Sequence, residues 1–65
     1  MKKLSRRESE IIELLCLGYE YSEIADALSI SKKTIPTYVE RILYKMSANN
    51  RVAAVANYVR LQYEN

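Results

Sequence analysis

The chain has 65 residues, which predicts a single domain over residues 1–65 with a thin core and no room for an enclosed active site beside its scaffold. One Gly and one Pro argue against a turn-rich β protein, and abundant Ala, Leu, Ile, Glu, Lys and Arg favour an all-α fold. The chain has no His and a single cysteine, Cys16, which excludes His-dependent catalysis, a zinc site of Cys and His ligands and an internal disulfide. We therefore expect no enzyme, no cofactor and no metal.

Two further general features bear on partners. The sequence has no signal peptide and no apolar run of about 20 residues, so we expect no membrane partner, and one Cys fits a reducing cytoplasm. The net charge of +2 is unevenly spread, because residues 1–30 sum to −2 whereas residues 31–51 carry five cations and one carboxylate, a sum of +4. Such a basic segment suits a phosphate backbone, although charge alone is better explained by a solvated face and matters only together with the helix pair described below.

The first helix is predicted over about residues 5–17. Ser5 and Glu8 have the spacing of a capping box, in which each side chain accepts a hydrogen bond from the backbone amide of the other. Gly18 is placed to end the helix in the left-handed conformation. The buried side is predicted to comprise Ile11, Ile12, Leu14, Leu15 and, at the core or its boundary, Cys16.

The second helix is predicted over about residues 21–28. It begins between Glu20 and Glu23, with Ser22 as one possible N-cap, and its packing face is formed by Ile24, Ala25 and Leu28. A tight turn at residues 28–31 leads into the next helix, an arrangement typical of a helix-turn-helix.

The third helix is predicted to begin at residue 32 or 36 and to end at residue 46. Ser31 and Thr34 are alternative N-caps, and Pro36 favours the later start because its missing amide is harmless in the first turn of a helix. Proline also disfavours helical angles at the residue before it, so Ile35 is predicted to be non-helical.

This third helix separates two faces. At about 100° per residue, one arc of roughly 100° holds the apolar side chains Ile35, Val39, Ile42, Leu43 and Met46. The far side holds hydroxyls, cations and a phenol: Thr34, Thr37, Tyr38, Arg41 and Lys45. A helix with one face to bury and one polar, cationic face is how a helix-turn-helix presents its recognition helix to DNA.

The fourth helix is predicted over about residues 50–63, with an Asn as N-cap. One apolar stripe consists of Val52, Ala56, Val59 and Tyr63, and another of Ala54, Tyr58 and Leu61, with Val55 between them. Together they span roughly 200°, about twice what packing on one side of a small core requires. The surplus favours self-association through this helix, although a helix central to a small core would show the same pattern.

The ordered combination of motifs resembles the LuxR/GerE-type helix-turn-helix signature from residue 4 to about residue 56. The residues that carry the resemblance are Leu4, Ser5, Arg7, Glu8, Glu10, Ile11, Ile12, Leu15, Gly18, Glu23, Ile24, Ala25, Leu28, Ile30, Ser31, Thr34, Ile35, Ile42, Lys45, Met46, Arg51, Ala54 and Val55. In size and layout the chain is similar to GerE-like regulators, which are free-standing helix-turn-helix domains.

The resemblance implies a bacterial, nucleoid-associated transcriptional regulator whose third helix enters the major groove and whose fourth helix pairs two protomers. Glu8 would tie the first helix to the motif. Thr34, Thr37, Tyr38 and Arg41 would face DNA, and Lys32, Lys33, Lys45 and Arg51 would lie near phosphates. The implied dimer interface comprises Val52, Val55, Ala56, Val59 and Tyr63.

Three residues depart from the family pattern. Pro36 replaces a basic or polar residue that often reads a base, Tyr38 replaces a frequent His, and Glu20 replaces a frequent Ser or Thr cap. The expected partners are double-stranded DNA and a second copy of the chain. The loss at Pro36 and the wide apolar fourth helix motivate an alternative: an antagonist that pairs with a larger LuxR-type regulator and blocks its DNA binding.

Overall fold

The computed structural model describes residues 2–64 and the side chains of residues 2–63, all in helices and short connections. The elements are α1 (Arg6–Cys16), α2 (Tyr21–Leu28), the 3₁₀ turn η1 (Lys32–Thr34), α3 (Ile35–Lys45) and α4 (Arg51–Glu64). The predicted all-α, four-helix fold is confirmed. None of the helices in the described part of the chain is long and apolar enough to cross a membrane.

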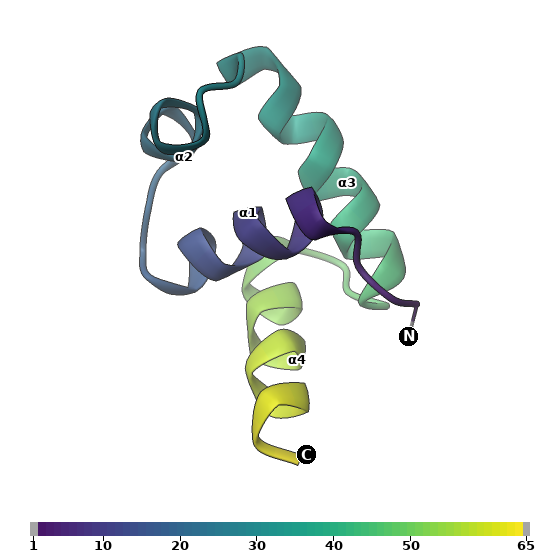
Figure 1. Ribbon diagram of the computed structural model, residues 1–65. Coiled ribbons are helices and arrows are strands. Elements are labelled where there is room, and N and C mark those ends of the chain that lie inside the picture. The colour runs from purple at the N-terminus through teal and green to yellow at the C-terminus, as the bar shows by residue number, and fades with distance from the viewer. Residues whose placement is uncertain (1, 65) are drawn as a thin grey trace.

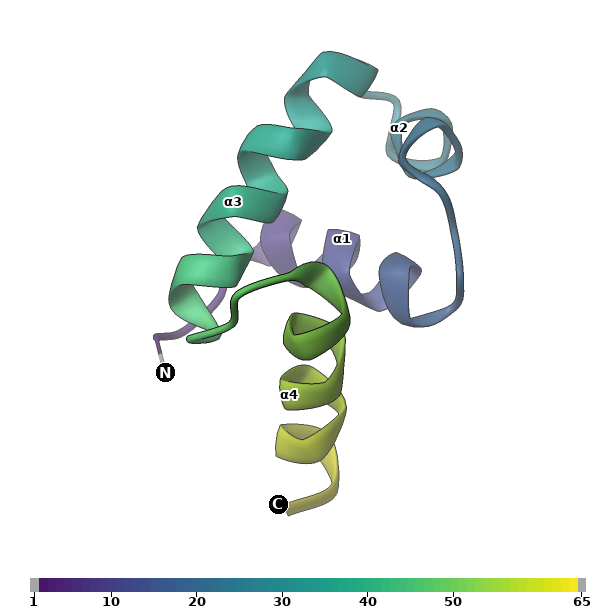
Figure 2. The same ribbon diagram turned by 180° about the vertical axis from the view of Figure 1, so that it is seen from behind.

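The helices surround one small core. Figure 1 shows α3 along one edge of the molecule, α1 packed across it, α2 beside the start of α3, and α4 extending away towards the C-terminus. Figure 2 gives the same arrangement from behind. The buried apolar side chains come from all four helices: Ile11, Ile12, Ile24, Ala25, Ile35, Val39, Ile42, Met46 and Ala54.

Both ends of α1 have the predicted form. At the start, the Ser5 Oγ accepts from the Glu8 amide at 3.2 Å and the Glu8 Oε1 accepts from the Ser5 amide at 2.8 Å, which confirms the capping box. At the end, Gly18 has a φ of 89° and its amide donates to the Leu15 carbonyl. Because the Tyr19 amide then reaches the Leu14 carbonyl, α1 closes in a Schellman motif that requires the left-handed glycine.

The prediction that Cys16 lies at the core or its boundary is wrong, since the side chain is exposed. Cys16 stands in the last turn of α1, at the rim of an open hollow between α1 and α4 rather than beneath either helix. Partial desolvation there and the neighbouring Glu13 carboxylate raise the pKa of the thiol. The thiol is therefore a poor nucleophile.

Helix α2 begins at Tyr21, within the predicted interval from Glu20 to Glu23 and two residues earlier than a Ser22 cap would allow. Glu20 occupies the N-cap position, and its amide donates to the Glu23 Oε1 at 2.8 Å, so the prediction of Ser22 as cap is wrong. A carboxylate at the third helical position meets a free amide and the positive end of the helix dipole, which favours this start. The helix ends at Ser29, which has a φ of 56°.

Both predicted cap residues stand at the start of α3, but only the Ser31 side chain makes a capping hydrogen bond. The Ser31 Oγ accepts from the Lys33 amide and caps η1, whereas Thr34 is the N-cap of α3 and Pro36 its second residue. Ile35 has helical angles of −59° and −47°, so the prediction that it is non-helical is wrong. Its side chain is fully buried, and the packing gained there outweighs the steric preference imposed by proline.

Helix α4 is capped by Asn50, whose Oδ1 accepts from the Ala53 amide at 2.8 Å. The wide apolar surface of α4 divides into a packed stripe and an open one. The packed side chains are Ala54, Val55, Tyr58 and Leu61, and the exposed ones are Val52, Ala56, Val59 and Tyr63. The small core therefore accounts for only one of the two stripes.

Two polar contacts hold α4 against the other helices. The Asn57 Nδ2 donates to the Met46 carbonyl at 2.9 Å and joins α4 to the end of α3. The Tyr58 hydroxyl donates to the Glu13 Oε2 at 2.7 Å and joins α4 to α1. Desolvation and this bond to Glu13 raise the pKa of Tyr58 to about 12, so the hydroxyl keeps its proton at neutral pH and remains a donor.

Candidate nucleic-acid interface

The surface called the outer face of α3 consists of Lys33 from η1 and five residues of α3, namely Pro36, Thr37, Glu40, Arg41 and Tyr44, and all six are exposed. On the opposite side of the same helix, Ile35, Val39 and Ile42 are buried. Both ribbon views show α3 at an edge of the molecule with no other helix over its outer side (Figures 1 and 2). The predicted separation of a buried apolar face from a polar face is confirmed, with Thr37 and Arg41 turned outward.

The centre of the outer face differs from the predicted one. Thr34, Tyr38 and Lys45 are half-buried at its flank, whereas Glu40 and Tyr44, which were not predicted, are exposed near its centre. The helical wheel could have found them, because Tyr44 lies about 20° from Thr37, and Glu40 about 60° from it. The predicted polar face ends at Thr37, just short of Tyr44, and it is defined by hydroxyls, cations and a phenol, which leaves out the Glu40 carboxylate.

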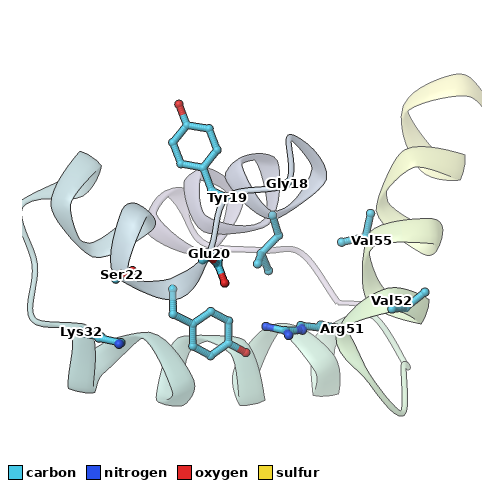
Figure 3. Close-up of a pocket in the computed structure, with 10 residues that line it drawn as sticks. Gly18, Tyr19, Glu20, Ser22, Lys32, Arg51, Val52 and Val55 are labelled. Carbon is cyan, nitrogen blue, oxygen red and sulfur yellow. The ribbon is translucent and has the colours of Figure 1, made fainter.

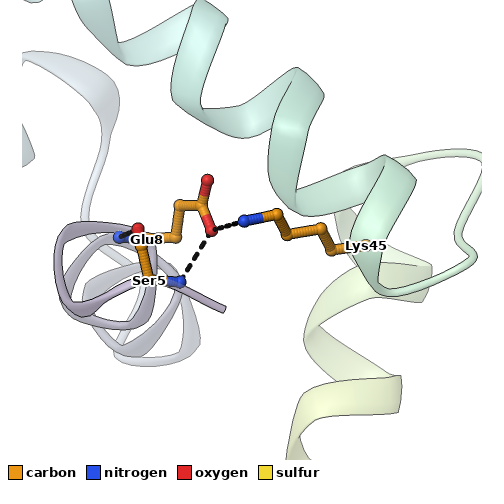
Figure 4. A network of polar contacts seen from close by, with 3 residues as sticks. All are labelled: Ser5, Glu8 and Lys45. Atoms are coloured by element: carbon orange, nitrogen blue, oxygen red, sulfur yellow. Dashed lines mark hydrogen bonds and ion pairs between the residues drawn. The ribbon is translucent and has the colours of Figure 1, made fainter. Parts of the chain in front are cut away.

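The Lys45 ammonium is bound to a carboxylate of the same chain (Figure 4). Its Nζ donates to the Glu8 Oε1 at 2.8 Å, and Glu8 is only 3% exposed. Burial works to raise the pKa of Glu8, but the hydrogen bond and charge of Lys45, together with the Ser5 amide, outweigh it and lower that pKa. The implied role of Glu8 as the tie between α1 and the motif is thus seen directly, and its carboxylate already balances the Lys45 charge.

Four of the five cations predicted to contact DNA are not neutralised in this way. Arg6 and Arg7 share Glu10 on the surface of α1. By contrast, among the described side chains, no carboxylate lies within 4.0 Å of the following cations of η1, α3 and α4: Lys32, Lys33, Arg41 and Arg51. Their charge is available to a polyanion.

The two arginines of this set are each held by a tyrosine ring. The Arg41 guanidinium carbon lies 5.8 Å from the centre of the Tyr38 ring, and that of Arg51 lies 5.1 Å from the Tyr21 ring. An aromatic face orients a guanidinium without cancelling its charge, whereas a carboxylate would cancel it. The half-buried Tyr38 therefore positions Arg41, although it was predicted to face DNA itself.

Lys32 and Arg51 line an open groove of about 610 Å³ between the junction of α1 and α2 and the start of α4. In Figure 3 they extend towards each other from opposite ends of this groove, with Glu20 between them. The groove thus brings together two of the cations predicted to lie near phosphates and the acid that replaces a frequent family cap.

Residues 2–57 match the family described as bacterial regulatory proteins, luxR family. The chain belongs to this family. It is 42% identical over 57 residues to the transcriptional regulatory protein DegU of Brevibacillus brevis, a match that covers 88% of this chain and 24% of DegU. It is 44% identical over 52 residues to the response regulator protein VraR of Staphylococcus aureus, which covers 80% of this chain and 25% of VraR. The chain thus spans about a quarter of the length of these curated relatives.

Among solved structures, that of the transcription factor GerE matches with a TM-score of 0.85 and 32% identity, over 91% of this chain and 88% of GerE. The chain is therefore a LuxR/GerE-type helix-turn-helix domain, the DNA-binding domain of a class of transcription regulators rather than of enzymes.

Proposed function

We propose that this domain places α3 in the major groove of double-stranded DNA and regulates transcription from there. The observation that carries the proposal is the outer face of α3, where Thr37 and Arg41 stand exposed above a fully packed apolar face. Exposed donors on a helix that no other element covers are what base edges and phosphates in a major groove require.

Phosphate contacts would flank the reading helix. Lys32, Lys33 and Arg51 have no carboxylate partner among the described residues, and Arg51 is held by the Tyr21 ring in the groove next to Lys32. These three cations would grip the backbone and fix the orientation of α3, because phosphate contacts position a protein on the duplex. We assign Lys45 a smaller share, since its ammonium is bound to Glu8.

Fluorescence anisotropy with labelled duplex DNA at several salt concentrations tests this proposal. Binding should weaken steeply as salt rises, and Arg51→Ala should lower the slope of log affinity against log salt by about 1. Arg41→Ala should also weaken binding relative to the wild type at the same salt concentration. Arg60→Ala is the matched control, because Arg60 is an exposed arginine on α4 bonded to Asn57 and should leave the slope unchanged. Absence of binding to any duplex at low salt would overturn the proposal.

We further propose that a second copy covers the open stripe of α4. Val52, Val59 and Tyr63 are 75%, 37% and 86% exposed on one side of a single helix, with Ala56 between them and Val55 at the packed flank. Apolar side chains gathered on one face favour a protein partner over water. Val59→Asp should turn a dimer into a monomer in analytical ultracentrifugation, and a wild-type chain that stays monomeric at high concentration would refute this.

One observation favours the alternative function, an antagonist of a larger LuxR-type regulator. Pro36 is exposed on the outer face of α3, where it offers no hydrogen-bond donor to a base. Adding the chain to a labelled complex of such a regulator with its operator separates the two functions. An antagonist releases the DNA through α4 pairing and binds no duplex itself, whereas a regulator binds DNA on its own.

A further inference from the structure

We propose that Glu40 reads a base directly and selects cytosine at one position of each half-site. The inference rests on the proposed placement of α3 in the major groove and, for the pair of half-sites, on the proposed dimer. It concerns a carboxylate that lies outside the face predicted from the sequence. Glu40 is exposed near the centre of the outer face. On the helical wheel it lies about 160° from Ile42, which is 1% exposed in the core, so the side chain leaves the helix on the side away from the protein.

The carboxylate of Glu40 has no cation to neutralise it. Pro36 and Tyr44, one turn away on either side, carry no charge, so no pair of the kind formed between positions four apart exists. Arg41 is the next residue and its guanidinium lies over the Tyr38 ring. No carboxylate–cation contact within 4.0 Å involves Glu40 among the described side chains. Its full charge and both oxygens are therefore available to a ligand.

The position of this charge conflicts with non-specific DNA binding. Lys33 and Arg41 share the outer face with Glu40 and attract phosphates, whereas Glu40 repels them. A carboxylate in such a place lowers affinity for every duplex unless it meets a donor on a base. Glu40 would then make binding selective, because a donor on a base offsets the repulsion in some sequences and no such donor is present in others.

The base edges identify the donor. In the major groove, guanine presents only acceptors and thymine an acceptor and a methyl group, and all of these disfavour a carboxylate. Adenine presents an amino donor beside the N7 acceptor, which repels the second carboxylate oxygen. Cytosine presents its N4 amino group without a neighbouring acceptor, and acceptance from this group is how Glu reads a base. Cytosine is therefore the base that Glu40 favours.

Selection of bound duplexes from a random pool tests the inference, with the wild type beside Glu40→Gln and Glu40→Ala. We expect the wild type to enrich cytosine at one position per half-site, preferred over other bases by about fivefold or more. Glu40→Gln should shift this preference to adenine, because an amide both donates to N7 and accepts from N6. Glu40→Ala should lose the preference at that position and bind unselected duplexes more tightly than the wild type does.

Glu10→Gln is the charge-matched control. It removes one negative charge on α1, where Glu10 forms ion pairs with Arg6 and Arg7, and it should leave the cytosine preference intact. The helix content of each variant, measured by far-UV circular dichroism, checks that it is folded. If Glu40→Ala keeps the wild-type base preference, or the wild type binds DNA without enriching cytosine, the inference is overturned while DNA binding stands. If no variant and no wild type binds any duplex, the proposed function falls first and this inference with it.

Discussion

Helices α3 and α4 each pack one apolar face into the core, but their exposed faces have opposite chemical character. Both helices pack against α1 and bury apolar side chains in the core, among them Ile42 of α3 and Ala54 of α4. On its other side α3 carries hydroxyl and charged groups, whereas α4 carries Val52, Val59 and Tyr63. The buried sides explain the fold, and the two exposed sides differ in the kind of partner they suit.

This difference indicates that the binding surfaces of the domain should be sought on the helix faces that do not pack into the core. A polar, partly cationic surface suits a hydrated polyanion, and an apolar surface suits another protein. Substitutions on the two sides of each helix should therefore separate stability from binding, and the following four predictions test that separation.

The largest effect is expected on the buried side of α3. Ile42→Ala should lower the free energy of unfolding by about 2–5 kcal/mol, because it leaves a cavity beneath a helix that holds much of the core. The matched change on the outer face, Thr37→Ala, should alter that free energy by no more than about 0.5 kcal/mol and weaken DNA binding instead. Urea unfolding of both variants measures this contrast, and equal destabilisation would break it.

The next effect concerns the tie between α1 and the end of α3. Glu8→Gln should cost about 2 kcal/mol of unfolding free energy near neutral pH, since it removes a charged hydrogen bond to Lys45. The pKa of Glu8 is lowered in the folded state, so its contribution is present above the usual value of 4.5 and is lost as the pH falls through the folded pKa. Unfolding curves should therefore differ most at neutral pH and converge in acid. A difference that grows as the pH falls would refute this.

A smaller effect is expected where α4 meets the end of α3. Asn57→Ala removes the donor to the Met46 carbonyl and should lower the unfolding free energy by about 1 kcal/mol. This contact joins α4 to the end of α3 away from the outer face, so thermal unfolding followed by circular dichroism should register the loss while DNA affinity at low salt stays within about twofold. Loss of DNA binding in the folded variant would show that the two helices are more tightly coupled than their separate surfaces suggest.

The smallest effect on stability is expected on the open stripe of α4. Val52→Ser changes a side chain that is 75% exposed, so the unfolding free energy of the monomer at low concentration should move by less than about 0.5 kcal/mol. Self-association measured by sedimentation should weaken. Destabilisation of a demonstrably monomeric sample would instead place Val52 in contact with its own chain.

Local rules predicted much of the fold. The capping box of Ser5 and Glu8, the left-handed Gly18 and the cap at Asn50 each involve residues within four positions of one another, where sequence spacing fixes geometry. The errors lie where tertiary packing outweighs a local preference. Ile35 is helical because its burial outweighs the effect of the following proline. Cys16 is exposed because it lies at the rim of the open hollow between α1 and α4, which the spacing of residues in α1 alone does not reveal.

The candidate interface was predictable only in part. Periodicity placed Thr37 and Arg41 outward correctly. It could not show that the Lys45 ammonium is bound by Glu8, because that contact joins positions 37 residues apart. The helical wheel places Glu40 and Tyr44 on the exposed side, but the predicted face ends just short of Tyr44 and leaves out carboxylates such as Glu40.

Two of the chain's bends are made by serine rather than glycine. Ser29 after α2 and Ser47 after α3 have φ values of 56° and 54°, so each places a Cβ where the left-handed backbone crowds it, a strain of about 1 kcal/mol. Glycine at either bend would relieve that strain but would also enlarge the freedom of the unfolded chain, which offsets part of the gain. These two positions are therefore natural starting points for a more heat-resistant version of the domain, since neither lies on the outer face of α3 or the open stripe of α4.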